Sequence, residues 1–175
     1  MLGQSISDPM GTEQKGTVRG MGLLPVTTVF EQEKRRTRVS GRFAKVGGAL
    51  AEMSGVCYEG YEIHMGRTVL SKGTVPLVYM EEEGEQRQDG AQSDHVYGCY
   101  MHGIFDKSET VKTFLAAVLR KKGIDPSKIT VRDRNAYKEE QYDRLASIVR
   151  ENLNMEAVYK IIEKGNEASC SLLSE

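Results

Sequence analysis

The spacing of apolar residues changes once along this chain, near Asp106, and this change limits the folds that it can adopt. Before Asp106, short stretches rich in β-branched and aromatic residues are separated by turn residues, which is typical of β-strands. Five such stretches are predicted to be strands: residues 21–30, 37–43, 61–65, 75–80 and 95–101. After Asp106 the apolar residues recur at helical spacing instead. Strands first and helices last predict a sheet followed by C-terminal helices.

The boundaries of these helices can be read from capping and terminating residues. Ser108 is a suitable N-cap for a first helix, with Glu109 in its first turn, and Gly123 would end it. A second helix is predicted from Ala136 onward, and Asn154 is expected to cap a last one, over residues 155–163.

The polar stretches between the apolar ones are predicted to be exposed loops or turns. They cover residues 4–20, 31–36 and 81–94. A chain of 175 residues fits a single domain. We expect that domain to occupy residues 1–165 and a tail to follow at 166–175.

Composition excludes several classes of protein. Lys and Arg total 24 and Asp and Glu total 25. Because these charges nearly cancel, the net charge does not favour binding to nucleic acid or to an anionic membrane. No apolar run approaches the ~20 residues that span a bilayer, and the N-terminus lacks the features of a secretory signal. The three cysteines, Cys57, Cys99 and Cys170, form no CxxC pair that would indicate a metal site. Free thiols of this kind predict a cytoplasmic protein.

His102 is the first candidate for a catalytic residue. It lies in the stretch YGCYMHGIFD, residues 97–106, next to a glycine and at the end of a predicted strand. A histidine with an ordinary pKa of about 6.5 can take and return a proton near neutral pH. The alternative is a structural histidine at a strand end.

Glu62 and His64 form a second candidate group. Their side chains share one face if residues 61–65 are extended. A carboxylate beside an imidazole can fix the imidazole tautomer or bind charged groups of a substrate, but a structural hydrogen-bonded pair is the alternative. Arg67 could pair with a substrate carboxylate or form a surface salt bridge.

Several segments of the chain, in the same order, resemble the cobyric acid synthase family. They read GLLPV (22–26), SGRF (40–43), GYEIHMGRT (60–68), YGCYMHGIFD (97–106), YDRLA (142–146) and NMEAVY (154–159). The resemblance runs from Met1 to about Ile162. It implies an α/β, flavodoxin-like class I glutamine amidotransferase fold, in which His102 serves a cysteine nucleophile and Glu62 and His64 lie close to the pocket for glutamine.

The resemblance also implies where that nucleophile lies. Family members carry a turn reading roughly GICGGYQMLG, of which Met1, Leu2 and Gly3 match the last three letters. The cysteine is therefore expected about five residues before Met1, in a domain whose leading strands also precede this chain. Alone, the chain is expected not to hydrolyse glutamine efficiently. Cys99 is expected to be a buried, unreactive thiol.

The group that orients His102 is left open by the sequence. Many class I amidotransferases carry a glutamate two residues after the histidine, but here Ile104 occupies that position. Asp106 could orient His102 only if the chain turns sharply at Gly103; a role in a turn or a helix cap is the alternative.

The resemblance implies the following partners. Glutamine would supply ammonia to an ATP-dependent ligase domain outside this chain, which amidates carboxylates of adenosylcobyrinic a,c-diamide during cobalamin biosynthesis. ATP and magnesium would belong to that domain, and no cofactor is expected in this chain, because Gly47 and Gly48 lack the Lys-Ser/Thr of a phosphate loop. Two alternatives remain: a non-catalytic binding module, or a related Cys-His amidotransferase with another acid substrate. The helical segment at 142–162 favours cobyric acid synthase over the latter.

Overall fold

The computed structural model describes residues 1–82 and 84–171, with the side chains of all of these except residues 34, 35 and 165–171. The chain divides into two compact units, Met1–Val131 and Arg132–Glu175. The first unit contains the sheet and one long helix, and it carries all the candidate site residues.

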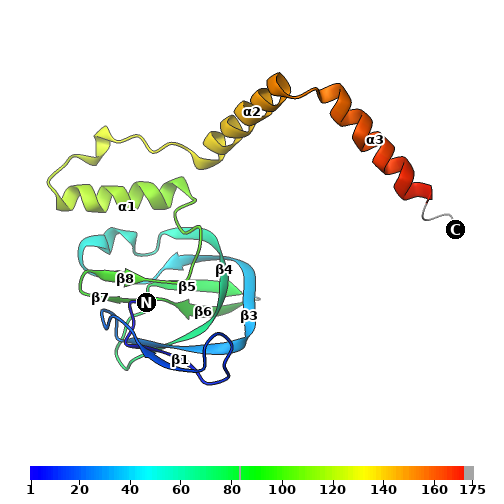
Figure 1. The fold of residues 1–175 in the computed structure, drawn as a ribbon. Coiled ribbons are helices and arrows are strands. Elements are labelled where there is room, and N and C mark those ends of the chain that lie inside the picture. Colours follow the sequence, from blue (N-terminus) through cyan, green and yellow to red (C-terminus); the bar gives the residue numbers. More distant parts are fainter. Residues whose placement is uncertain (83, 172–175) are drawn as a thin grey trace. The chain divides into compact units, whose positions relative to one another are not determined.

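A six-stranded sheet forms the framework of the first unit (Figure 1). Its strands follow the order β2-β1-β3-β5-β6, and β4 pairs with β3. The β1–β3 pair is parallel and the other pairs described in this sheet are antiparallel. The strands are β1 (Ser5–Asp8), β2 (Gly16–Arg19), β3 (Val26–Phe43), β4 (Cys57–Leu70), β5 (Val78–Glu82) and β6 (Glu85–Asp89). A separate hairpin pairs β7 (Ala91–Ser93) with β8 (Val96–Gly98).

The long strand β3 corrects one expectation from the sequence. Two strands separated by a charged turn at residues 31–36 were predicted, but β3 is continuous from Val26 to Phe43. Its register with β4 shifts between Phe30 and Arg35, which marks a local irregularity. The turn prediction is wrong because β4 supplies backbone partners along nearly the whole of β3, and backbone pairing does not require apolar side chains.

Two predicted loops also contain strands. Residues 4–20 include β1 and β2, and residues 81–94 include β6 and β7. In the first, the Asp8 carboxylate accepts hydrogen bonds from the backbone N–H groups of Thr12, Glu13 and Gln14, which fixes the connection between the strands. Both stretches are polar, so their strands carry no apolar alternation that the sequence would reveal.

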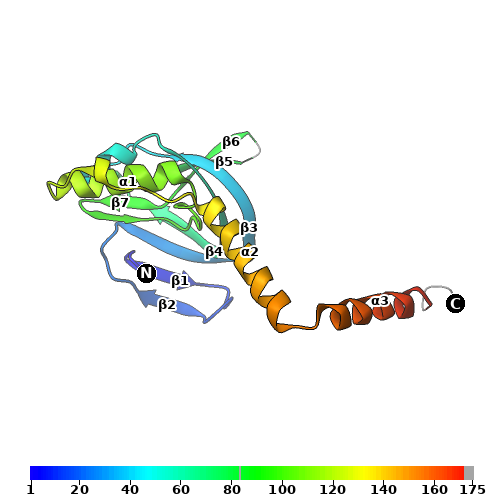
Figure 2. The same ribbon diagram turned by 90° about the horizontal axis from the view of Figure 1, so that it is seen from above.

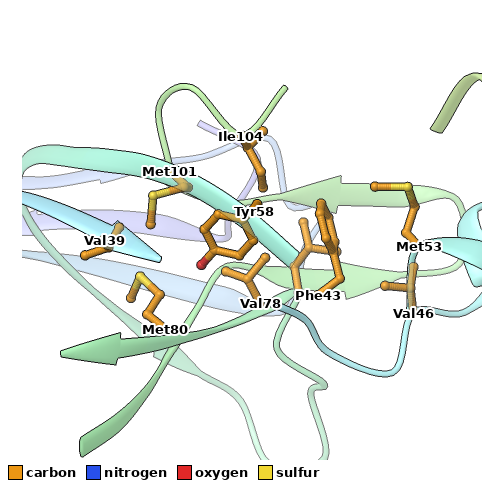
Figure 3. Packing of buried hydrophobic residues seen from close by; sticks show 10 residues of the cluster. Val39, Phe43, Val46, Met53, Tyr58, Val78, Met80, Met101 and Ile104 are labelled. Atoms are coloured by element: carbon orange, nitrogen blue, oxygen red, sulfur yellow. The ribbon is translucent and has the colours of Figure 1, made fainter. Parts of the chain in front are cut away.

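The main hydrophobic core lies between the C-terminal half of β3, β4, β5 and the helical segments (Figure 3). Its buried members are Val39, Phe43, Val46, Met53, Tyr58, Leu77, Val78, Met80, Met101 and Ile104. Helix α1 (Ser108–Lys121) packs Phe114 against this core and contacts the short helix η1 (Gly48–Met53). In both views α1 and β1 lie at opposite sides of the first unit (Figure 2).

The ends of α1 agree with the sequence to within one residue. Lys107 is the N-cap and Ser108 the first helical residue, whereas Ser108 was predicted as the cap. Gly123 follows the helix with a φ of 71°, a conformation that glycine adopts without strain. A short turn of helix, η2 (Pro126–Lys128), comes next.

The second unit consists of two helices. Helix α2 spans Arg134–Asn152, and its N-cap Asp133 accepts a hydrogen bond from the backbone N–H of Ala136. Helix α3 spans Met155–Ser171, and the Asn154 side chain accepts from the Ala157 N–H at 3.1 Å, which confirms the predicted cap. Because α3 extends past residue 163, it includes the first residues of the predicted tail. Within the described ranges, no helix combines the length and the apolar character that crossing a membrane requires.

Candidate active site

His102 lies on a short segment that two buried neighbours anchor. Met101 and Ile104 point into the hydrophobic core (Figure 3), while the His102 side chain is exposed. The His102 backbone N–H donates to the carbonyl of Tyr61 on β4 at 2.9 Å, and its carbonyl accepts from the Tyr61 N–H at 3.0 Å. The segment is therefore fixed to β4 by backbone pairing and by packing, independently of the imidazole.

The His102 ring stacks on the ring of Tyr61. The two ring centroids are 5.2 Å apart and the ring planes differ by 13°. Gly60 permits this approach, because a Cβ at that position would stand 2.3 Å from the His102 carbonyl oxygen. Beyond the histidine, Gly103 has a φ of 74° and its carbonyl accepts from the Asp106 N–H at 2.8 Å. The chain thus turns sharply here, and the backbone of Asp106 closes the turn.

Glu62 and His64 lie on the same face of β4, as an extended strand requires. His64 Nε2 is 3.1 Å from Glu62 Oε1, and the guanidinium of Arg87 on β6 contacts Glu62 Oε2. Glu62 is 0% exposed, so its carboxylate has no contact with solvent. Arg87 Nε lies 3.1 Å from a carboxylate oxygen of Glu82. We call Glu62, His64 and Arg87 the buried ionic cluster.

Tyr100 connects this cluster to the segment that carries His102. Its ring stacks on His64 with centroids 4.8 Å apart, and its hydroxyl is 2.9 Å from the hydroxyl of Thr28 on β3. The Tyr100 backbone N–H donates to the buried carboxylate of Asp89 at 2.8 Å. Tyr100 precedes His102 by two residues, so these contacts also fix the approach to the candidate base.

The two buried carboxyl groups differ in their electrostatics. Burial raises the pKa of Glu62, but hydrogen bonds from His64 and Arg87 and the positive charge of Arg87 outweigh burial, so this pKa lies below its ordinary value. Burial also raises the pKa of Asp89, and there the backbone hydrogen bonds from Tyr100 and Gly90 do not offset it. If His64 is in the tautomer that carries its proton on Nε2, it donates to Glu62 and its Nδ1 is an acceptor.

The two candidate groups lie on opposite faces of β4. Glu62 and His64 come together, but His102 pairs with Tyr61, whose side chain points to the other face. The sequence analysis missed Arg87, Tyr100 and Tyr61. Arg87 lay in a predicted loop, so nothing in the sequence placed it on a strand beside Glu62. Both tyrosines lie within the motifs at residues 60–68 and 97–106. Their roles could not be predicted because the sequence did not show how these two segments pair.

The described cysteines do not resemble an activated nucleophile. Burial raises the pKa of the Cys99 thiol to about 11, with Asp89 contributing, which agrees with the expected unreactive thiol. Cys57 is exposed on β4, and the Cys170 side chain lies outside the described residues. Arg67 forms an exposed ion pair with Glu31, at 2.7 Å between Nε and Oε1. Among the described residues, no group of three or more His, Cys, Asp or Glu side chains is arranged around a metal position.

Comparison with known proteins gives the class to which this fold and site belong. The family model for CobB/CobQ-like glutamine amidotransferase domains matches residues 1–110, which include the sheet, His102 and the buried ionic cluster. The chain therefore belongs to this family. The predicted α/β, flavodoxin-like class I glutamine amidotransferase fold is confirmed with it.

Cobyric acid synthases are among the individual proteins to which this chain is similar. That of Ruminiclostridium cellulolyticum is 47% identical over 171 residues, which is 95% of this chain and 33% of the relative. Those of Lachnoclostridium phytofermentans and Alkaliphilus metalliredigens are 39% and 41% identical over 175 residues, covering 94% and 93% of this chain and 34% of each relative. The chain spans about a third of the length of the curated relatives that it matches.

Proposed function

We propose that this chain is the glutaminase portion of a cobyric acid synthase. One observation carries the proposal: His102 presents an exposed imidazole on a segment that backbone pairing and core packing fix to β4, within the motif that carries the resemblance to the family. The family of glutamine amidotransferase domains and the high identity to cobyric acid synthases support the same conclusion. The resemblance implies that members of this family use a histidine to exchange protons with a nucleophilic cysteine.

In this proposal His102 moves two protons. It takes the proton of the nucleophilic cysteine and gives it to the departing amide nitrogen, so that the thiolate displaces ammonia from the side-chain amide of glutamine and forms a thioester. Water then hydrolyses the thioester to glutamate, and His102 takes a proton from that water and returns it to the cysteine. The chain spans about a third of the length of its relatives, and we propose that this cysteine lies in the remaining part. The partly buried thiol of Cys99, with its raised pKa, does not replace it. A histidine at the surface of its strand can meet a partner from another segment, whereas the fully buried carboxylate of Glu62 cannot.

We further propose that His64 and Glu62 support the binding of glutamine. His64 lines a pocket of about 220 Å³ together with Thr68 and Arg67. Among the described side chains, His64 Nδ1 and the Thr68 hydroxyl are buried without a hydrogen-bond partner, so each has a free position for a ligand or a water molecule. Glu62 is fully buried and does not contact the ligand itself. In this proposal it fixes the tautomer and the ring orientation of His64.

The acceptor of the ammonia belongs to the proposal for the whole protein. We propose that the ammonia passes to an ATP-dependent ligase region, which amidates carboxylates of adenosylcobyrinic a,c-diamide in the cytoplasm. Gly47 and Gly48 are followed by Ala49 and Leu50, without the lysine of a phosphate loop, so this glycine pair gives no support to a nucleotide site in this chain. We therefore assign ATP and magnesium to that ligase region.

The test is glutamate release from glutamine. We would compare this chain with the same chain extended upstream through its native reading frame, each with His102 intact and as His102→Ala. Activity in the extended protein that falls by about a thousand-fold in His102→Ala supports the proposal, because general acid-base catalysis is worth about 10²–10⁴-fold. His95, exposed in the turn between β7 and β8, provides the matched control: His95→Ala should leave the rate unchanged.

Two results would contradict the proposal. Full activity in the chain as given would mean that a cysteine within residues 1–175 is the nucleophile, and Cys99→Ser would then be the next variant. A folded, extended protein that releases no glutamate would favour a non-catalytic binding module. A rise in KM for glutamine in His64→Gln, with kcat unchanged, would support the assigned role of His64.

A further inference from the structure

The segment around His102 has a hydrophobic residue where many class I amidotransferases have a carboxylate. Ile104, two residues after His102, is part of the hydrophobic core and is 9% exposed. A catalytic imidazole must be held in one orientation to exchange protons with a nucleophile, and in a triad the third residue does this. In this chain a group other than residue 104 has to hold the ring of His102.

Tyr61 is placed to do so. Residues 61 and 102 exchange both of their backbone hydrogen bonds, so they face each other directly across the strand pair and their side chains stand on the same side. Their rings are nearly parallel, at 13°, with centroids 5.2 Å apart. Aromatic pairs at such distances contribute beyond simple burial.

Stacking on Tyr61 is compatible with proton transfer by His102. The two ring nitrogens of an imidazole make hydrogen bonds in the plane of the ring, so a neighbour on the ring face leaves both nitrogens accessible. The face of a tyrosine ring carries negative charge density, which attracts the imidazolium that forms when His102 accepts a proton. Tyr61 thus restricts the ring without occupying its reactive positions.

We propose that Tyr61 is the positioning residue for His102, in place of a carboxylate. The catalytic meaning of this inference rests on the proposed glutaminase function, but the orientation of the ring does not. Tyr61 is 44% exposed and is not a member of the main core, so its replacement should not unfold the protein. Tyr61→Leu removes the stacked ring, and Tyr61→Phe keeps it without the hydroxyl.

The first experiment uses the chain as given and needs no activity. The sequence has three histidines, so proton NMR of histidine-labelled protein can follow each imidazole after assignment with His102→Gln. A proton above an aromatic ring resonates upfield, and we expect the His102 ring protons upfield of those of the exposed His95. Tyr61→Leu should move them downfield, whereas Tyr61→Phe should not. His64, stacked on Tyr100, is the internal control and should not move in either variant.

The second experiment measures kcat and KM for glutamine in the upstream-extended protein. We expect Tyr61→Leu to lower kcat by about three- to ten-fold with KM unchanged, and Tyr61→Phe to retain the wild-type rate. A purely structural role would not produce this division between kcat and KM.

The outcomes separate this inference from the proposed function. Unchanged His102 signals in Tyr61→Leu, or equal changes in Tyr61→Phe, would overturn the stacking assignment. A wild-type kcat in Tyr61→Leu, with the NMR shift present, would overturn the positioning role. If the extended wild-type protein releases no glutamate, the glutaminase proposal fails, while the NMR comparison still decides whether Tyr61 orients His102.

Discussion

The two faces of β4 at residues 61 and 62 differ in solvent exposure and in the kind of contacts that their side chains make. On one face, Tyr61 and His102 form an exposed stacked pair on backbones that are hydrogen-bonded to each other. On the other, Glu62 is fully buried and its two oxygens are committed to His64 and Arg87. Neighbouring residues of one motif therefore have different environments.

This difference explains how the motif GYEIHMG can be both structural and functional. The exposed pair can meet a reactant, so its chemistry is available but its orientation must be maintained by stacking. The buried ionic cluster cannot meet a reactant through Glu62, but it fixes β4 to β6 and, through Tyr100, supports the segment that carries His102. Substitutions of Tyr61 and His102 should therefore change activity with little effect on stability, and those of Glu62 and Arg87 the reverse.

Arg87→Met should give the largest change in stability. It leaves the Glu62 carboxylate buried without its main counter-charge, and loss of one partner of a buried ion pair costs about 3–5 kcal/mol. Because Arg87 is 30% exposed, we expect a value near the lower end, about 3 kcal/mol in the free energy of unfolding by urea. The exposed pair should be unaffected, so the His102 NMR signals should not move.

The double variant Glu62→Gln with Arg87→Met provides the control. It removes both charges, so it should be more stable than Arg87→Met alone. A double variant that is less stable than either single variant would show that the ionic contacts within the cluster do not account for its stability.

Gly60→Ala should disturb both faces at once. The new Cβ would stand 2.3 Å from the His102 carbonyl oxygen and 3.1 Å from Met101 Sδ, so the segment must move away from β4. We expect a loss of about 1–3 kcal/mol in unfolding free energy, as in other overpacked sites. The His102 ring protons should also lose their upfield shift.

Gly47→Ala is the matched control for this substitution. Gly47 has an ordinary φ of −97°, and its Cβ would meet only Gln92 Oε1, at 3.7 Å. This variant should unfold like the wild type. If Gly60→Ala does the same and keeps the NMR signals, the pairing of Tyr61 with His102 is not as close as the structure indicates.

The pH dependence of stability distinguishes the two buried carboxyl groups. The folded-state pKa of Glu62 lies below its unfolded value of about 4.3, so its ionised form stabilises the fold above that pH. This contribution is lost as the pH falls through the folded-state pKa. Asp89 has a raised pKa, so the fold gains stability from it as the pH falls through that value toward about 3.9.

Urea unfolding between pH 7 and pH 3 measures this contrast. The difference in stability between the wild type and Glu62→Gln should shrink below about pH 4.3. The difference between the wild type and Asp89→Asn should change in the opposite direction on acidification. Slopes of the same sign for both variants would mean that one of the two assignments is wrong.

The sequence predicted those features that depend on local pattern or on motif. The helix α1, the Asn154 cap and the shared face of Glu62 and His64 follow from spacing along one segment. The continuous β3 and the strand β6 could not be predicted in this way, because their polar residues form strands only through pairing with neighbours. Arg87 lies on β6, so its ion pair with Glu62 could not be predicted without that strand.

Arg67→Met should give the smallest effect, and it sharpens the comparison with Arg87→Met. Both arginines pair with a glutamate, but the Arg67 and Glu31 side chains are 61% and 44% exposed. Ion pairs of this kind contribute about 0–1 kcal/mol, so we expect a change below about 0.5 kcal/mol in urea unfolding. The sequence left open whether Arg67 binds a substrate carboxylate. In the extended protein, an unchanged KM for glutamine would identify Arg67 as a surface ion-pair residue, whereas a KM raised at wild-type stability would show that it leaves Glu31 to bind substrate.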